Sequence, residues 1–244
     1  MRRGAVATPE IRAAAGTLWA FRAHAERDAA ARFRRMTEGL DSSGALPVVI
    51  RMASDAAGDE DRHARLCAQA AARFDHPVRD VSSEEAPAMA PPTLGLRERV
   101  LYEVVAQCCI TETLSAVYLR QMMGNTVGEP LHGMIQEVLK DEVSHSRLGW
   151  AHLASERDLG MDMSFLGPHL SDMLAGTVQE ALFGPEPAED PSLLLRPFGG
   201  LSHEERRDGF EGALAEVILP GLETHGVDVG AARDWLEART SIRR

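Results

Sequence analysis

Two stretches of this sequence carry the same pattern, Asp59-Glu60-Asp61-Arg62-His63-Ala64-Arg65-Leu66 and Asp141-Glu142-Val143-Ser144-His145-Ser146-Arg147-Leu148, and both read D-E-x-x-H-x-R-L. In an α-helix, residues i and i+3 share one face, so the Glu and the His of each copy can present an oxygen and a nitrogen to the same point. Oxygen and imidazole donors in this arrangement suit a metal ion. The repeat therefore predicts a metal site built from two helices.

Each copy lies in the middle of a long segment with helical periodicity. We predict helices over about residues 9–39, 47–74, 94–123 and 129–158. In the first of them, apolar residues recur at spacings of three and four, as in an amphipathic helix, at Leu18, Phe21, Ala25, Ala29, Phe33 and Met36. Short turns join the helices in pairs, and a long proline-containing crossover over 77–93 joins the pairs. This order predicts an all-α fold with an antiparallel four-helix bundle.

Four glutamates of these helices are expected at one level of the bundle. Glu26 lies 13 residues before Gly39, and Glu60 lies 13 residues after Pro47. In the second pair, Glu112 lies 12 residues before Gly124, and Glu142 lies 13 residues after Glu129. Because antiparallel helices climb together from the turn that joins them, all four carboxylates reach roughly 18 to 20 Å along each hairpin. The site is therefore predicted to be one layer of the bundle.

The order of these residues resembles the ferritin-like di-iron carboxylate proteins, which take one Glu from each of two helices and Glu-x-x-His from the other two. The resemblance covers about residues 9–158, and Ile110-Thr111-Glu112-Thr113 and Asp141 to His145 are also similar to bacterial ferritin-like domain proteins. It implies six metal ligands, Glu26, Glu60, His63, Glu112, Glu142 and His145. It also implies two iron ions and O2 as a co-substrate.

The burial of four carboxylates is the physical argument for metal. Inside an apolar bundle without partners, each charge would cost several kcal/mol. Two divalent cations would cancel the four charges. A carboxylate-rich donor set with imidazole suits iron or manganese better than zinc, so Fe/Fe and Mn/Fe both stay open.

Several other residues have competing interpretations. A third Glu-x-x-His, Glu129 to His132, opens a helix and is read as structural, since an acidic side chain suits the helix N-terminus. Asp59 and Asp141 either accept the free ring N–H of a ligand histidine or are simply exposed. Arg65 and Arg147 either pair with those aspartates or face solvent.

Composition and charge argue against some classes of binding partner. The chain has 244 residues, 44% of them hydrophobic, and a formal net charge of −11, which argues against nucleic acid and against an anionic membrane surface. No apolar run of 18 to 20 residues stands out in the sequence, so we expect no membrane span. Three cysteines form no disulfide framework, which is typical of a reducing compartment, and we expect a cytoplasmic protein.

Residues 161–244 are expected to form a helical extension that packs on a 1–160 bundle domain. We predict helices over about 165–182, 202–218 and 231–238, with a proline-rich linker over 184–197 and a bend or end at Pro220. Ser202 and Glu205 fit a capping box. The extension would serve as a lid, a pocket wall or a dimer surface, and a homodimer is among the expected assemblies.

The leading functional hypothesis is a di-metal oxidase or oxygenase that uses O2 on a small organic substrate. The alternative is a ferroxidase or iron-handling protein without an organic substrate, and a further one is a redox-silent interaction protein that keeps the metals only for its fold. The sequence names neither the substrate nor a catalytic residue beyond the ligands.

Overall fold

The computed structural model describes residues 7–79, 86–185 and 190–240, and this part of the chain is helical with no strand. Four long helical rods come first in the chain: α1 (Pro9–Ser42), α2 (Pro47–Ala72), the continuous rod α3 (Leu96–Val104), η1 (Val105–Glu112) and α4 (Thr113–Asn125), and α5 (Glu129–Asp158). These bounds agree with the four predicted helices to within three residues. Residues 80–85 of the predicted crossover lie outside the described residues.

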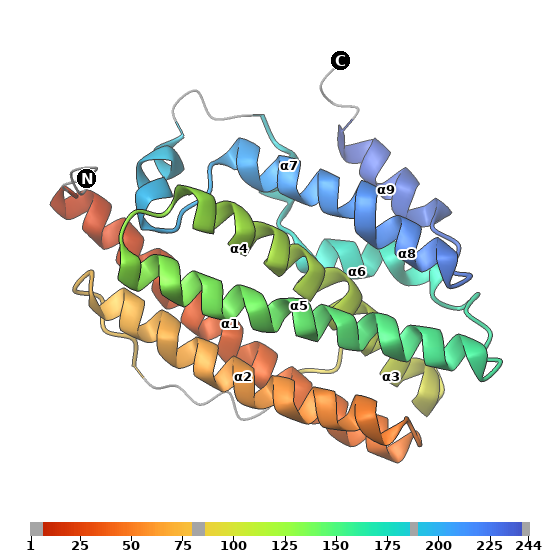
Figure 1. Cartoon of the computed structure of the whole chain (residues 1–244). Coiled ribbons are helices and arrows are strands. Elements are labelled where there is room, and N and C mark those ends of the chain that lie inside the picture. Colours follow the sequence, from red (N-terminus) through yellow and green to blue (C-terminus); the bar gives the residue numbers. More distant parts are fainter. Residues whose placement is uncertain (1–6, 80–85, 186–189, 241–244) are drawn as a thin grey trace.

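Local sequence sets the ends of these rods. Thr8 caps α1 by accepting a hydrogen bond from the Ile11 backbone N–H, and Pro9 fits the first turn because its missing N–H is not needed there. Gly44 and Gly128, at the turns before α2 and α5, have φ angles of 75° and 107° that disfavour a side chain. The rods contact one another in the pairs α1–α2, α2–α5, α5 with η1 and α4, and α1–α3 (Figure 1).

The buried face of α1 differs from the predicted stripe. Phe21 is 64% exposed and Ala25 is also exposed, whereas the buried face carries Ala15, Trp19, Ala23, Glu26, Ala30, Phe33, Met36 and Leu40. Alanines dominate the first half of this face, which lets α1 and α2 approach closely. The predicted stripe is therefore correct at Phe33 and Met36 and wrong in the first half of the helix, where Phe21 and Ala25 lie outside the interface.

The third rod is interrupted by a π-helical segment, η1, which no sequence signal predicted. Thr111 marks the wider turn, because its hydroxyl donates to the backbone oxygen of Ala106, five residues earlier. Gly149 of α5 makes room for this segment, since a Cβ there would lie 2.6 Å from the Cβ of Cys108. Such π-helical turns occur frequently at functional sites.

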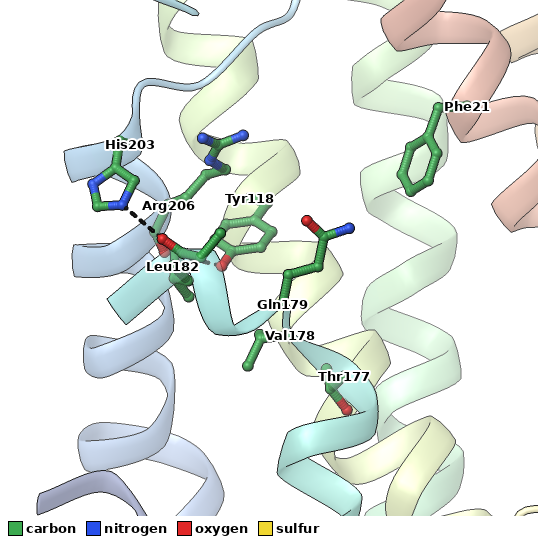
Figure 2. Close-up of a pocket in the computed structure, with 9 residues that line it drawn as sticks. Phe21, Tyr118, Thr177, Val178, Gln179, Leu182, His203 and Arg206 are labelled. Atoms are coloured by element: carbon green, nitrogen blue, oxygen red, sulfur yellow. Dashed lines mark hydrogen bonds between the residues drawn. The ribbon is translucent and has the colours of Figure 1, made fainter. Parts of the chain in front are cut away.

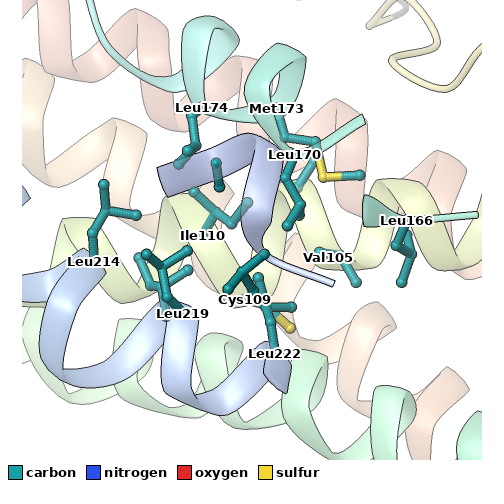
Figure 3. Close-up of a cluster of buried hydrophobic side chains, with 14 of the residues drawn as sticks. Val105, Cys109, Ile110, Leu166, Leu170, Met173, Leu174, Leu214, Leu219 and Leu222 are labelled. Atoms are coloured by element: carbon teal, nitrogen blue, oxygen red, sulfur yellow. The ribbon is translucent and has the colours of Figure 1, made fainter. Parts of the chain in front are cut away.

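The chain after α5 packs against the third rod. It contains α6 (Leu170–Thr177), α7 (His203–Ala213), η5 (Leu214–Ile218), α8 (Leu219–Thr224) and α9 (Gly230–Thr240), with short 3-10 turns between them. Apolar side chains of η1, α6, η5 and α8 form one buried cluster (Figure 3). That cluster joins residues from both sides of position 160, and the division into two domains stays a prediction.

Parts of this extension differ from the predictions. The predicted helix over 165–182 ends at Thr177, because Val178 is extended and follows the weak helix formers Gly176 and Thr177. Pro220 does not end its helix, which continues through α8 to Thr224 after the π-helical turn η5. The linker contains a 3-10 helix, Pro191–Phe198, and its residues 186–189 lie outside the described residues. The capping box of α7 is confirmed, since the Ser202 hydroxyl accepts from the Glu205 backbone N–H and the Glu205 carboxylate accepts from the Ser202 N–H.

One helix in the described part, Leu96–Asn125, is long and apolar enough by composition to cross a membrane. The expectation that no such stretch exists was therefore wrong. In this structure 72% of the apolar window is buried inside the molecule. Buried core helices of soluble proteins pass the same test, so the finding is weak evidence for a span.

Candidate metal centre

The six side chains predicted as ligands all lie buried in the interior. They come from four elements, with Glu26 on α1, Glu60 and His63 on α2, Glu112 at the end of η1, and Glu142 and His145 on α5. Each of them is at most 6% exposed. The rings of His63 and His145 are neighbours, with centroids 5.9 Å apart and planes tilted by 37°.

Their donor atoms form two overlapping groups that could each hold a metal ion. The first consists of Glu26, Glu60, His63 and Glu142, and the second of Glu60, Glu112, Glu142 and His145. Within each group, one donor atom from every residue lies within 4.8 Å of the others. Glu60 and Glu142 belong to both groups, so these two carboxylates stand between the two positions.

Several inward-facing atoms make no well-aligned hydrogen bond in the described part of the chain. They are both carboxylate oxygens of Glu60, Oε2 of Glu142 and the Nδ1 atoms of His63 and His145. The distance from Nδ1 to the Glu60 carboxylate is 3.4 Å for His63 and 2.9 Å for His145. Buried polar groups in proteins are normally satisfied, and each exception needs a reason. An ion bound by these atoms would supply it.

The outer nitrogen of each histidine faces an aspartate on the opposite helix. Nε2 of His63 on α2 lies 3.2 Å from Asp141 on α5, and Nε2 of His145 on α5 lies 3.5 Å from Asp59 on α2. An aspartate that accepts the Nε2–H holds the ring in the tautomer whose Nδ1 lone pair points at the cluster. The interpretation of both aspartates as histidine partners therefore has a geometric basis, and the contacts cross between helices.

Arg62 links the two aspartates. Its guanidinium donates to Asp59 at 2.6 Å and to Asp141 at 2.5 Å. Arg65 and Arg147, which were expected either to pair with these aspartates or to face solvent, are both exposed. Comparison of the two repeats could not identify Arg62 as the partner, because the second copy has Ser144 at the corresponding position.

Two more side chains near the cluster were missed. Arg22 lies one turn before Glu26 and contacts its carboxylate at 3.2 Å, a spacing of i and i+4 that sequence could have flagged. The amide of Gln107 donates to Glu112. Gln107 precedes Glu112 by five residues, which places them together only because η1 is a π-helix, and no sequence signal marks that.

Crowding of charge shifts the pKa values of the cluster. Burial, followed by repulsion from Glu142 and Glu60, raises the pKa of Glu112 well above its ordinary value, and burial with repulsion from Glu60 raises the pKa of Glu142. Burial opposes a charged imidazole at His145, but the contacts with Glu142 and Glu60 outweigh it and raise the pKa to about 11. The metal-free cluster therefore retains protons near neutral pH, and cations binding there would displace them.

A pocket of about 400 Å³ opens beside the cluster. Glu26, Glu112 and Glu142 form part of its wall, so the carboxylates are reachable from one side. Gly176 and Thr177, at the end of α6, form another part, which gives the C-terminal extension the role of a pocket wall. This size falls in the ordinary range of small-molecule sites.

We expect Asp141→Asn to weaken metal binding by about 10- to 100-fold, because the amide no longer provides a charged acceptor for the Nε2–H of His63. Metal affinity is measured by competition with a chromogenic chelator, using Zn²⁺ as a redox-silent probe. Asp61→Asn is the matched control, since Asp61 is an aspartate of the same repeat that pairs with Arg34 away from the histidines. Equal affinities for the two variants would show that Asp141 does not support the histidine.

No known family model matches this chain, and no curated protein is similar to it.

Proposed function

We propose that this protein is a ferritin-like di-metal enzyme, with two iron ions or one manganese and one iron, that uses O2 to oxidise a small organic substrate. The observation that carries the proposal is the pair of overlapping buried donor groups that share Glu60 and Glu142. The unpartnered inward atoms of those residues and of both histidines support it. Water alone is a poor explanation, because it adds no positive charge to a buried site where four carboxylates crowd together.

The donor set and its helical framework support a ferritin-like bundle. Two rods each contribute a single Glu, and two contribute Glu-x-x-His, in the order that the resemblance implies. Glu26, Glu60 and His63 would hold one ion and Glu112, Glu142 and His145 the other, and Glu60 and Glu142 belong to both donor groups. Carboxylates and neutral imidazoles suit iron and manganese, and the cysteines contribute no donor to either group.

In this proposal the bound metal pair supplies the electrons that O2 takes up. The chain's own residues do the rest. Asp141 and Asp59 fix the histidine tautomers, and Arg62 holds the aspartates in place. Buried apolar side chains around α1, α2 and α5 keep bulk water from that side, and the pocket admits a substrate from the other.

The test is the reaction of the reduced, iron-loaded protein with O2. We expect Fe(II)-loaded protein to consume O2 rapidly, followed with an oxygen electrode and by stopped-flow absorbance, while Zn²⁺-loaded protein consumes none. An Fe(II)-loaded protein that stays reduced in air would contradict the proposal. Continued turnover of excess Fe(II) into a ferric mineral would instead support the ferroxidase, which needs no organic substrate.

A further inference from the structure

The charged lining of the pocket beside the cluster includes an arginine without an ion pair among the described residues. Arg32 lies on α1 and lines the pocket. Its guanidinium makes no ion pair with any carboxylate in the described part of the chain. Its Nε atom is buried and has no hydrogen-bond partner there. Arg34 and Arg35, its neighbours in sequence, each pair with a carboxylate outside this pocket, Asp61 and Glu103. Arg32 is therefore a half-buried cation in the pocket wall, and no carboxylate of the described residues lies within ion-pair distance of it.

A short chain of contacts connects this cation to the metal cluster. Nη1 of Arg32 donates to the side-chain oxygen of Gln107 at 3.4 Å, and the amide of Gln107 donates to Glu112. Gln107 is only 2% exposed, so this link is fixed in the interior. A group bound by Arg32 would thus lie one side chain away from a carboxylate of the second donor group.

The charge balance of the pocket favours an anion once the cluster holds metal. Two divalent cations would neutralise the four glutamates of the cluster. The remaining charged groups in the pocket wall are the arginines Arg22 and Arg32 and the single carboxylate Asp28. Arg22 contacts Glu26, and a metal bound to Glu26 would leave the positive charge of Arg22 less well neutralised. The loaded pocket would carry a net positive charge.

The rest of the wall is mixed, with Thr111, Ser115 and Thr177 on the polar part and an apolar part on α1. Ala25, Ala29 and Phe21 line it from α1. Phe21 and Thr177 also border a second pocket of about 330 Å³, whose lining includes Tyr118, Val178 and Leu182. Figure 2 shows Phe21 on one side of this second pocket and Tyr118 on the other. An organic body therefore has apolar surface to occupy beyond the charged end.

We propose that the pocket takes a small organic acid, whose carboxylate pairs with Arg32 while its apolar body lies against Phe21, Ala25 and Ala29. This inference rests on the proposed function, because it assigns the substrate class of the same site. A planar guanidinium binds a carboxylate through two parallel hydrogen bonds, which gives orientation as well as affinity.

The test uses three probes of one shape and different charge: benzoate, benzamide and benzamidine. Binding to Zn²⁺-loaded protein is measured by isothermal titration calorimetry. We expect benzoate to bind at least about tenfold more tightly than benzamide, and benzamidine to bind weakest. Arg32→Gln should weaken benzoate by about 10- to 100-fold and leave benzamide unchanged, whereas Arg32→Lys should keep most of the preference for the anion.

Arg34→Gln is the matched control, because it removes the same charge from the same helix outside the pocket. Benzamide binding as tightly as benzoate would overturn the proposal. An Arg32→Gln variant that binds benzoate as tightly as the unaltered protein would also overturn the proposal, because the metal would then bind the carboxylate instead of Arg32. The comparison of the probes on the unaltered protein holds even if Arg32→Gln fails to fold.

Failure here is distinguishable from failure of the proposed function. Zinc does not react with O2, so the calorimetry is independent of oxidation chemistry. Benzoate binding through Arg32 in a protein whose Fe(II) form ignores O2 would overturn the enzyme and support the acid site. Rapid O2 consumption without any preference for benzoate would support the enzyme and overturn the acid site.

Discussion

Glu142→Ala is expected to abolish binding of both metal ions, whereas His63→Ala is expected to remove one and leave the other. The difference arises because Glu142 belongs to both donor groups and His63 belongs only to the first. Losing a shared carboxylate leaves each ion one ligand short and removes the charge between them. Metal content per chain, measured by inductively coupled plasma mass spectrometry after loading and desalting, separates the two outcomes.

The controls come from the third Glu-x-x-His. Glu129→Ala and His132→Ala change the same residue types on α5, the helix of Glu142. Glu129 is exposed at the first turn, and neither residue belongs to a donor group. Both should keep full metal content. Glu142→Ala should also stay folded without metal, because removing one of several crowded carboxylates relieves repulsion. Full metal content in Glu142→Ala would show that the ligands are wrongly assigned.

Loading with metal is expected to raise the melting temperature by roughly 10 to 20 °C. At a free metal concentration of about 100 times Kd, each site adds about 2.7 kcal/mol to the free energy of unfolding. For a chain of this size, 1 kcal/mol corresponds to roughly 2 to 4 °C. Differential scanning calorimetry of the apo and the Zn²⁺-loaded forms measures the shift. A melting temperature that does not respond to metal would contradict a buried metal centre.

The rise in melting temperature on metal loading should be larger at higher pH. In the metal-free protein, His145 has a pKa raised to about 11 against an ordinary value of 6.5, so its stabilising contribution is complete below pH 6.5 and is lost as the pH rises toward 11. The raised pKa values of Glu112 and Glu142 act in the same direction. Above pH 4.5, the ordinary pKa of a glutamate, the folded protein increasingly has to hold these carboxyls charged in a crowded interior, which lowers its stability. Metal replaces those protons. The difference in melting temperature between loaded and apo protein should therefore be larger at pH 9 than at pH 6, and a smaller difference would contradict proton displacement.

The composition of the cluster could be predicted from the sequence because it depends mainly on local geometry. The i and i+3 spacing puts Glu60 beside His63 and Glu142 beside His145 in any α-helix. The distance of Glu26 and Glu112 from their turns sets their height in any short-turned hairpin. These six residues do come together in the interior. The role as metal ligands, the oxygen chemistry and the cytoplasmic location stay predictions.

Other features depend on how the helices meet. The pairing of Asp141 with His63 and of Asp59 with His145 requires the rotation and axial offset of α2 against α5, which no single helix encodes. The π-helical turn that brings Gln107 to Glu112 is stabilised by packing against Gly149 and the C-terminal extension. The buried face of α1 was set by its neighbours, and Phe21 was left at a pocket rather than in the core.

The sequence alone thus determined the four long helices, their order and the shared level of the six donors, because backbone periodicity fixes which side chains share a face and the distance from each turn fixes the height. Only the tertiary structure decided the crossed aspartate–histidine pairs, the unpaired Arg32 and the pocket beside the cluster. These depend on distances between elements far apart in the chain, and those distances follow from the packing of all the helices together.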